Sequence, residues 1–303
     1  MKKAILLLLF VLIYTNSQAQ KDFQGMAVYE SKTSTADLKV RMEGNKNINP
    51  EMQKMMQERM KKMFEKTFIL NFDKSASIYK EEEKLDANPQ GGGFRMMSSM
   101  TGGGGTFYKN VKDKTYTVDK EFMGKEFLVK DSLASLNWKM EAETRVIGGY
   151  TCYKATTVKP GSSTYLLGIP RRIQSKQDVQ ENKKNEIDKS TEAKKTNFMD
   201  AVELPEEITI TAWYTPEIPV NQGPEGYWGL PGLILEVNDG KTIILCSKVI
   251  LNPKEKAEIK PSSKGKVVGQ KEYNETVMKK MEEFREMNQG RGDRGGMQIR
   301  IGQ

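Results

Sequence analysis

Apolar and polar residues alternate along most of the chain from Phe23 onward, the pattern of strands that turn one face to a core. Gly148-Gly149 and Asn238-Asp239-Gly240 each lie between two such stretches and suit tight hairpin turns. Consecutive hairpins predict an antiparallel sheet of about ten strands. The expected strands cover residues 25–30, 36–42, 67–72, 77–81, 106–111, 115–119, 138–147, 150–158, 164–168, 208–214, 233–237 and 241–250.

Two stretches have helical spacing instead. At Asn49-Pro50-Glu51, an N-cap residue, a proline at the first helical position and an acidic residue predict a helix that runs to about residue 66. Residues 270–288 predict a second, amphipathic helix. The fold class that follows is mainly β, with two helices packed on an antiparallel curved sheet or half-barrel. This architecture resembles that of lipoprotein carriers, which shelter acyl chains.

A single domain is expected over residues 20–288, because the length and apolar content suffice for one sizeable core. Two segments interrupt the alternation of apolar and polar residues, and their composition predicts flexible insertions. Residues 88–105 are rich in glycine, and residues 171–203 mix basic and acidic side chains with few apolar ones. Residues 289–303 are rich in glycine and arginine and predict a disordered tail.

The first 19 residues have the three parts of an export signal: Lys2 and Lys3, an apolar core, and small residues before a cut after Ala19. The apolar core of about 11 residues is shorter than the length that spans a bilayer, and no later stretch is longer. We therefore expect a mature protein that begins at Gln20, is periplasmic or secreted, and does not span a membrane once the signal is removed.

Charge and composition argue against several functions. The formal net charge falls from +8 to +6 when the signal leaves, and the remaining excess is dispersed, which argues against a nucleic-acid partner. The chain has no histidine, and it shows no nucleophile–base pair, metal-ligand spacing or phosphate loop. We expect no enzymatic activity, no catalytic residues, no metal site and no cofactor.

The two cysteines, Cys152 and Cys246, lie 94 positions apart in predicted strands. In an oxidising compartment they are candidates for a disulfide, which would constrain the unfolded chain by about 4–5 kcal/mol on the entropy model. Two separately buried thiols are the alternative, because a disulfide requires Cα atoms within about 7 Å.

Methionine is frequent, at 18 residues, and it forms almost the whole apolar face of the first predicted helix. Met52, Met56 and Met60 on that face are candidates for contact with an apolar ligand, since thioether side chains adapt to varied surfaces. Gap-filling core residues are the simpler interpretation. A Cu(I) site is a third, weakened by the absence of histidine.

The least ordinary stretch of the chain runs from Gly226 to Val237, where a turn of glycine and proline leads directly into an apolar strand. Structure alone accounts for most of it: glycines permit close backbone approach, and Pro231 fixes one φ angle. The functional alternative is that Tyr227 and Trp228, with Trp213, form an aromatic border beside a ligand site.

Within this stretch, Gly229-Leu230-Pro231-Gly232-Leu233-Ile234 resembles the signature of the GLPGLI family, an uncharacterised group of exported proteins of Bacteroidota. The resemblance implies secretion and a largely β domain, with no assigned activity. It spans roughly residues 25–284. It is also carried by Val146-Ile147-Gly148-Gly149-Tyr150, Cys152, Lys154-Ala155, Ala212-Trp213-Tyr214-Thr215, Ile218-Pro219, Gly223-Pro224 and Lys264-Gly265-Lys266.

The leading functional hypothesis is a non-enzymatic envelope protein that binds an apolar ligand or a lipid-bearing partner between sheet and helices. One alternative is a protein-interaction or structural component of the envelope, with the charged and glycine-rich segments as contact elements. The other is a copper-handling protein that uses methionine.

Overall fold

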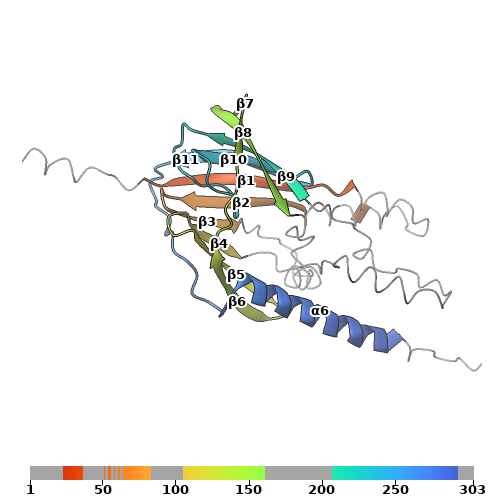
Figure 1. Ribbon diagram of the computed structural model, residues 1–303. Helices are drawn as coiled ribbons and strands as arrows, with labels where there is room; N and C mark the ends of the chain where they lie inside the picture. Colours follow the sequence, from red (N-terminus) through yellow and green to blue (C-terminus); the bar gives the residue numbers. More distant parts are fainter. Residues whose placement is uncertain are drawn as a thin grey trace, which may run out of the picture.

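The computed structural model describes residues 23–36, 64–82, 105–160 and 207–292, together with residues 51, 54, 55, 58 and 61. In this part of the chain, one twelve-stranded sheet runs through the molecule and one helix, α6 (Gln270–Gly292), lies along one end of it (Figure 1). The fold is thus mainly β, as the alternation predicts.

Every pair of neighbouring strands is antiparallel except β12 with β6, and the two edges, β12 and β7, do not meet, so the sheet is open. The spatial order is β12-β6-β5-β4-β3-β2-β1-β11-β10-β9-β8-β7. The strands are β1 (Gly25–Thr33), β2 (Glu65–Phe72), β3 (Ala76–Glu81), β4 (Thr106–Asn110), β5 (Thr115–Phe122), β6 (Lys125–Ser132), β7 (Lys139–Ile147), β8 (Tyr150–Pro160), β9 (Glu207–Thr215), β10 (Leu233–Asn238), β11 (Thr242–Leu251) and β12 (Lys266–Val268).

Ten of the expected strands are confirmed, with ends that differ by a few residues. The expected strand over 164–168 lies outside the described residues, as does that over 36–42 apart from Ala36, which is not in a strand. The strands β6 and β12 were not predicted. The turn into β6 uses Met123 and Gly124, both at positive φ (49° and 74°), and methionine is not a turn residue that a sequence pattern signals.

The second predicted helix is confirmed as α6, which begins at Gln270 as expected and continues to Gly292, into the predicted tail. The first predicted helix lies mostly outside the described residues. Its described positions 51, 54, 55, 58, 61 and 64 are helical, whereas 65 and 66 belong to β2. The arrangement of two packed helices is therefore not supported. Met52, Met56 and Met60 lie outside the described residues.

Helix α6 is held against the end of the sheet by a filled apolar core. Tyr273 and Val277 are almost fully buried among strand residues, and the Tyr273 ring meets the Phe127 ring edge to face at 5.5 Å between centroids. The core comprises Val118, Phe122, Phe127, Val129, Val268, Tyr273 and Val277. The described contact between helix and sheet thus leaves no room for a ligand at this point.

The central part of the sheet has one face that we call the inner face, which carries Tyr29, Ser77, Tyr79 and Lys109. Cross-strand pairing places Tyr79 opposite Leu70 and Phe107, and Ser77 opposite Phe72 and Lys109. An apolar cluster on this face joins both halves of the sheet. Its members are Ala27, Tyr29, Leu70, Phe72, Tyr79, Cys152, Trp213, Ile218, Val220, Leu233, Leu235, Ile244 and Cys246.

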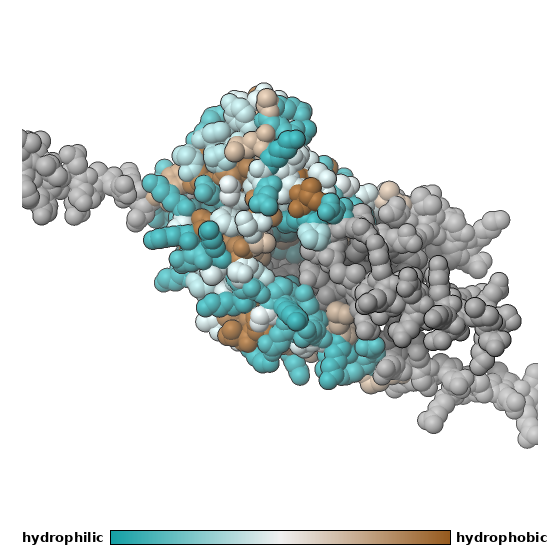
Figure 2. Space-filling model, viewed as in Figure 1, coloured by the Kyte–Doolittle hydropathy of each residue, from teal (hydrophilic) through white to brown (hydrophobic). Residues whose placement is uncertain are grey.

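The described surface in Figure 2 is mostly hydrophilic, with apolar residues in separate spots. Exposed apolar side chains nevertheless occur near the β7 edge, where Met140 and Val146 are 61% and 71% exposed. Between them, β7 carries charged residues, a common means of discouraging edge-to-edge pairing.

Candidate functional site

The segment between β9 and β10, residues 216–232, lies on the inner face, and we call it the motif loop because it ends in the glycine–proline signature. Its apolar residues Ile218 and Val220 are buried in the central cluster. Where the loop enters β10, the Tyr29 hydroxyl donates a 2.7 Å hydrogen bond to the carbonyl of Ile234. The Ser77 hydroxyl donates to Gln222 Oε1 at 2.9 Å. The loop is therefore fixed to β1 and β3.

The strongest anchor of the motif loop is Lys109 of β4, whose side chain is completely buried. Its ammonium group donates three hydrogen bonds to main-chain carbonyls, those of Gly223 (2.5 Å), Glu225 (2.8 Å) and Tyr227 (2.9 Å). Three carbonyl acceptors match the three N–H donors of an ammonium group. One lysine thereby fixes five consecutive residues of the loop, from Gly223 to Tyr227.

Burial lowers the pKa of Lys109 to about 7, and the nearby carboxylate of Glu225 opposes this shift. Desolvation disfavours the charged form, whereas the three carbonyls and Glu225 favour it. The protonation of Lys109 therefore depends on the position of the loop. If the loop left the sheet, the ammonium group would lose its three carbonyl acceptors and would be hydrated instead.

The glycines of the signature have two different reasons to be glycine. A Cβ on Gly232 would lie 2.1 Å from the carbonyl oxygen of Thr215, so a side chain there would collide with backbone. Gly229 faces open space but has φ +95°, a conformation that side chains disfavour. The signature is therefore explained by packing and backbone geometry.

The aromatic residues predicted to border a ligand mostly contact other parts of the protein. Trp213 and Tyr227 are buried, in the central cluster and in a second cluster that contains Leu230. Trp228 is half-buried, and its indole N–H donates to the carbonyl of Ala134 at 3.0 Å. The indole of Trp138 donates in turn to the carbonyl of Trp228 at 2.9 Å. These residues fasten the loop to the segment before β7 and are not an open aromatic border.

Glu225 is the one residue of the motif loop, other than glycine, that has a positive φ (46°). This conformation costs free energy and is enriched at functional sites. The residue is exposed, yet desolvation by its surroundings raises the pKa of its carboxyl. Lys159 opposes this effect most, Asp239 adds to it, and Lys109 and Lys120 also oppose it. We call Glu225, Lys120 and Lys159 the charged cluster.

The charged cluster brings together distant strands. Lys120 belongs to β5 and Lys159 to β8, and seven strands lie between these two in the sheet. In a flat sheet, eight spacings would separate them by about 38 Å. Both lysines nevertheless contribute to the electrostatic environment of one carboxyl group, that of Glu225.

Each lysine of the cluster lies over an aromatic ring. The Lys159 ammonium is 4.1 Å from the centroid of the Tyr227 ring, and the Lys120 ammonium is 5.0 Å from that of Tyr273. Desolvation lowers the pKa of both lysines, and Glu225 opposes the shift in each case. The rings hold the two ammonium groups without neutralising them.

Half-buried aromatic pairs lie beside the cluster on the inner face. The rings of Phe68 and Tyr79 stack at 4.6 Å between centroids, and those of Phe107 and Tyr116 at 5.2 Å. Phe107 is directly opposite Val118, two positions from Lys120 on the same face of β5. Apolar ring surface and accessible charge therefore adjoin each other here.

Two buried donors on this face have no hydrogen-bond partner within the part of the chain that the structure describes: the Tyr79 hydroxyl and Gln222 Nε2. Tyr79 is 4% exposed and Gln222 is 0% exposed. Buried donors are nearly always paired, since leaving one unpaired costs about 1–3 kcal/mol. Burial raises the pKa of Tyr79, and Glu225 is the largest electrostatic contributor to that shift. The orphaned hydroxyl therefore belongs to the surroundings of the charged cluster.

The predicted disulfide is not formed: Cys152 and Cys246 are both free and buried. They lie on β8 and β11, with β9 and β10 between them, a separation of about 14 Å in a flat sheet. Both side chains lie in the apolar cluster on the inner face, but their backbones belong to strands that are not neighbours in the sheet. Burial raises the pKa of each thiol to about 11.

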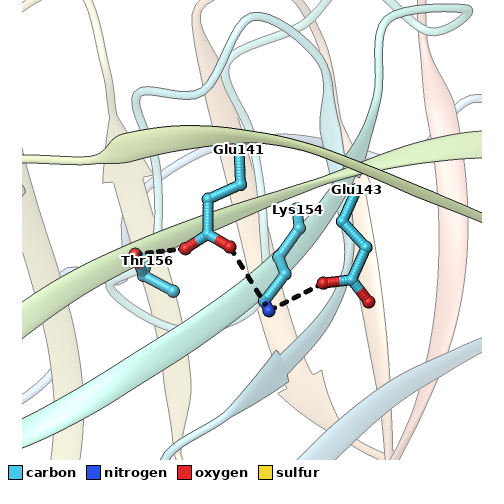
Figure 3. A network of polar contacts seen from close by, with 4 residues as sticks. All are labelled: Glu141, Glu143, Lys154 and Thr156. Atoms are coloured by element: carbon cyan, nitrogen blue, oxygen red, sulfur yellow. Dashed lines mark hydrogen bonds and ion pairs between the residues drawn. The ribbon is translucent and has the colours of Figure 1, made fainter.

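A second group of charges lies on the β7–β8 hairpin (Figure 3). Lys154 is 2.8 Å from Glu143 and 3.3 Å from Glu141, and Thr156 donates a 2.9 Å hydrogen bond to Glu141. These partly exposed pairs are internally satisfied. Nearby, Arg145 pairs with the buried Glu236 and lies 4.2 Å from the centroid of the Trp213 ring. Both groups stabilise the edge of the sheet.

The sequence patterns did not indicate a role for Lys109, Lys120, Lys159 or Glu225. One signal was present, because alternation over 106–111 places Lys109 on the same face as Phe107. No signal marked Glu225. In the described residues, no three His, Cys, Asp or Glu side chains are grouped so that they could hold a metal ion. The charged cluster comprises two cations and one carboxylate with aromatic rings nearby.

The fold and site define a class: an open, curved and mostly antiparallel sheet with a long loop fastened to its inner face by a buried lysine. Among the described residues, no helix has the length and apolar character needed to cross a membrane.

Comparison with known proteins assigns no function to this fold. A family model described as "Protein of unknown function (Porph_ging)" matches residues 138–236, which include β7 to β9 and the motif loop. No curated protein matches the chain. Two solved structures of PNGF-II, in space groups C2 and P21, are similar at 14% and 15% identity, with TM-scores of 0.44 and 0.43. They cover 85% and 84% of this chain, which spans only 33% of theirs. The predicted likeness to lipoprotein carriers is not supported.

Proposed function

We propose that the chain is an exported, non-enzymatic protein that binds an apolar ligand or a lipid-bearing partner on the inner face of its sheet. The observation that supports this most is the half-buried ring surface of Phe68 and Phe107 beside the accessible charged cluster. Sites for small ligands combine apolar and aromatic surface with a few fixed polar groups. Lys109 keeps the motif loop in place, so this surface exists before a ligand arrives.

The proposed surface differs from the one expected from sequence. Tyr273 and Val277 fill the contact between α6 and the sheet, so a ligand is assigned instead to the neighbouring surface over β2 to β5. Trp213 and Tyr227 support this surface from within the core. Roles for Met52, Met56 and Met60 stay predictions.

A second candidate function is recognition of another envelope protein at the β7 edge. The specific observation is the exposure of Met140, Val146, Tyr153 and Val158 on the terminal hairpin. Their separation by charged residues makes the surface smaller and more polar than the inner face.

Native mass spectrometry of the mature protein from an envelope fraction, prepared without detergent, tests the main proposal. We expect a lipid-sized added mass on the wild-type chain and much less on Phe107→Ala. Tyr108→Ala is the matched control, because Tyr108 lies on the opposite face of the same strand. A bare wild-type chain, in a preparation where a known carrier keeps its ligand, would contradict the proposal and favour the β7 edge.

Export is tested separately by the intact mass. We expect the recovered protein to begin at Gln20, after loss of residues 1–19. Recovery of an uncleaved chain in the cytoplasm would contradict export without bearing on ligand binding.

A further inference from the structure

We infer that the inner face recognises the anionic group of its ligand, a carboxylate or a phosphate, with Lys120 and Lys159 as the cations that receive it. This inference rests on the proposed binding function and names the chemistry of the ligand. It follows from three observations on the charged cluster and the donors around it.

The first observation is that the two lysines lack ion-pair partners. Within the described residues, no carboxylate oxygen lies within 4.0 Å of either ammonium group, and each instead lies over a tyrosine ring. Exposed surface lysines lose nothing by remaining unpaired, but these two are half-buried and partly desolvated. A partly desolvated cation without a partner is stabilised by any anion that reaches it.

The second observation is the excess of positive charge and donors. Three lysines and two carboxylates surround the loop, with Lys109, Lys120 and Lys159 against Glu225 and Asp239. The orphaned Tyr79 hydroxyl and Gln222 Nε2 are also donors. Carboxylate and phosphate groups carry negative charge and acceptor oxygens with several lone pairs, so they complement a surplus of cations and donors. An amine ligand would add a further cation and further donors.

The third observation is Glu225 itself. Its carboxyl group is influenced electrostatically by all three lysines, and its backbone has a positive φ where its carbonyl accepts the hydrogen bond from Lys109. Desolvation by its surroundings and the charge of Asp239 raise its pKa, so it takes up a proton more readily than an ordinary glutamate. An arriving anion would lie close to Glu225 as well as to the lysines, and protonation of Glu225 would remove the repulsion between the two.

Isothermal titration calorimetry with probes of equal chain length tests the inference: octanoate, octyl phosphate and octan-1-ol, with inorganic phosphate as a competitor. We expect the two anionic probes to bind about tenfold tighter than octan-1-ol. Lys120→Met with Lys159→Met should abolish this preference and leave octan-1-ol binding unchanged. Lys112→Met with Lys125→Met is the matched control, since it removes the same charge from an exposed turn and from the exposed first residue of β6.

A gain of binding provides a test that misfolding cannot imitate. Glu225→Gln should bind octanoate several-fold tighter than wild type and should lose the strengthening that wild type shows as pH falls, because the variant has no carboxyl group to protonate. Competition by inorganic phosphate would show that a free anion suffices, and its absence would show that the chain of an amphiphile is also needed.

The outcomes separate the two proposals. Equal affinity for octanoate and octan-1-ol, or an anion preference that survives the double lysine variant, overturns the inference but keeps the binding surface. If no probe binds and no added mass is found on the protein from the envelope, the proposed function fails and the inference fails with it.

Discussion

The ammonium group of Lys109 donates a 2.8 Å hydrogen bond to the main-chain carbonyl of Glu225, 116 positions away, while the side chain of the same glutamate favours the lysine's charged form. One strand residue thus fixes both the position and the electrostatic setting of the loop residue that the chain presents to solvent. The stability of the motif loop and the setting of Glu225 are coupled through this pair.

Lys109→Met should lower the free energy of unfolding by about 3 kcal/mol, because three buried carbonyls lose their donor while the apolar stem is kept. Lys112→Met, in the exposed turn after β4, should change it by less than about 0.5 kcal/mol. Urea denaturation followed by tryptophan fluorescence measures both. Equal, small effects would mean that the loop does not depend on Lys109.

The contribution of Lys109 should depend on pH. Its pKa is about 7 in the folded chain and 10.5 as the ordinary value, so between these values the unfolded chain binds the additional proton. Stability then rises with pH, by up to about 1.4 kcal/mol per pH unit. We expect the difference between wild type and Lys109→Met to grow from about pH 6.5 to about pH 8.5, and titration of the cysteine thiols cancels in this difference because both proteins carry them. A constant difference would show that the three carbonyls keep the lysine charged throughout.

The two thiols should be unreactive in the folded protein. Their pKa values of about 11 leave little thiolate near pH 8, and both side chains are buried. We expect no reaction with Ellman's reagent in buffer and two equivalents after unfolding in denaturant without reductant. Cys152→Ser should give one equivalent. No reactive thiol after unfolding of the wild type would reveal a disulfide.

Arg145→Met should destabilise the fold by about 2–3 kcal/mol, because the Glu236 side chain, only 12% exposed, would keep a buried charge without its cation. Adding Glu236→Gln should recover part of the loss. Lys154→Met removes a cation from the more exposed network of Figure 3 and should cost less than about 1 kcal/mol. Thermal unfolding of all three variants makes the comparison, and a larger loss for Lys154→Met would contradict it.

The two signature glycines should respond differently to alanine. Gly232→Ala places a Cβ against the Thr215 backbone and should cost about 3 kcal/mol or prevent folding. Gly229→Ala meets no atoms and should cost about 1–2 kcal/mol, the price of its positive φ alone. Soluble yield and urea midpoints measure the order. A larger loss for Gly229→Ala than for Gly232→Ala would contradict the assignment of the close backbone contact to Gly232.

Local pattern predicted much of the fold because strands and hairpin turns follow from short-range physics. The alternation around Tyr29 and Leu70, the Gly148-Gly149 turn and the start of α6 at Gln270 all depend on neighbours within a few positions. The turn at Met123 escaped prediction, because nothing in a methionine side chain favours positive φ.

Residue patterns alone predict a mainly β chain with paired strands and a glycine–proline turn that leads directly into an apolar strand. Long-range contacts place Lys109 beneath the motif loop, put Cys152 and Cys246 on strands that are not neighbours, and bring Lys120 and Lys159 within electrostatic range of Glu225. The physical reason is that strand order arises from contacts between segments far apart in the sequence, such as β1 and β11. A lysine in a strand has the same local pattern whether it faces water or three carbonyls.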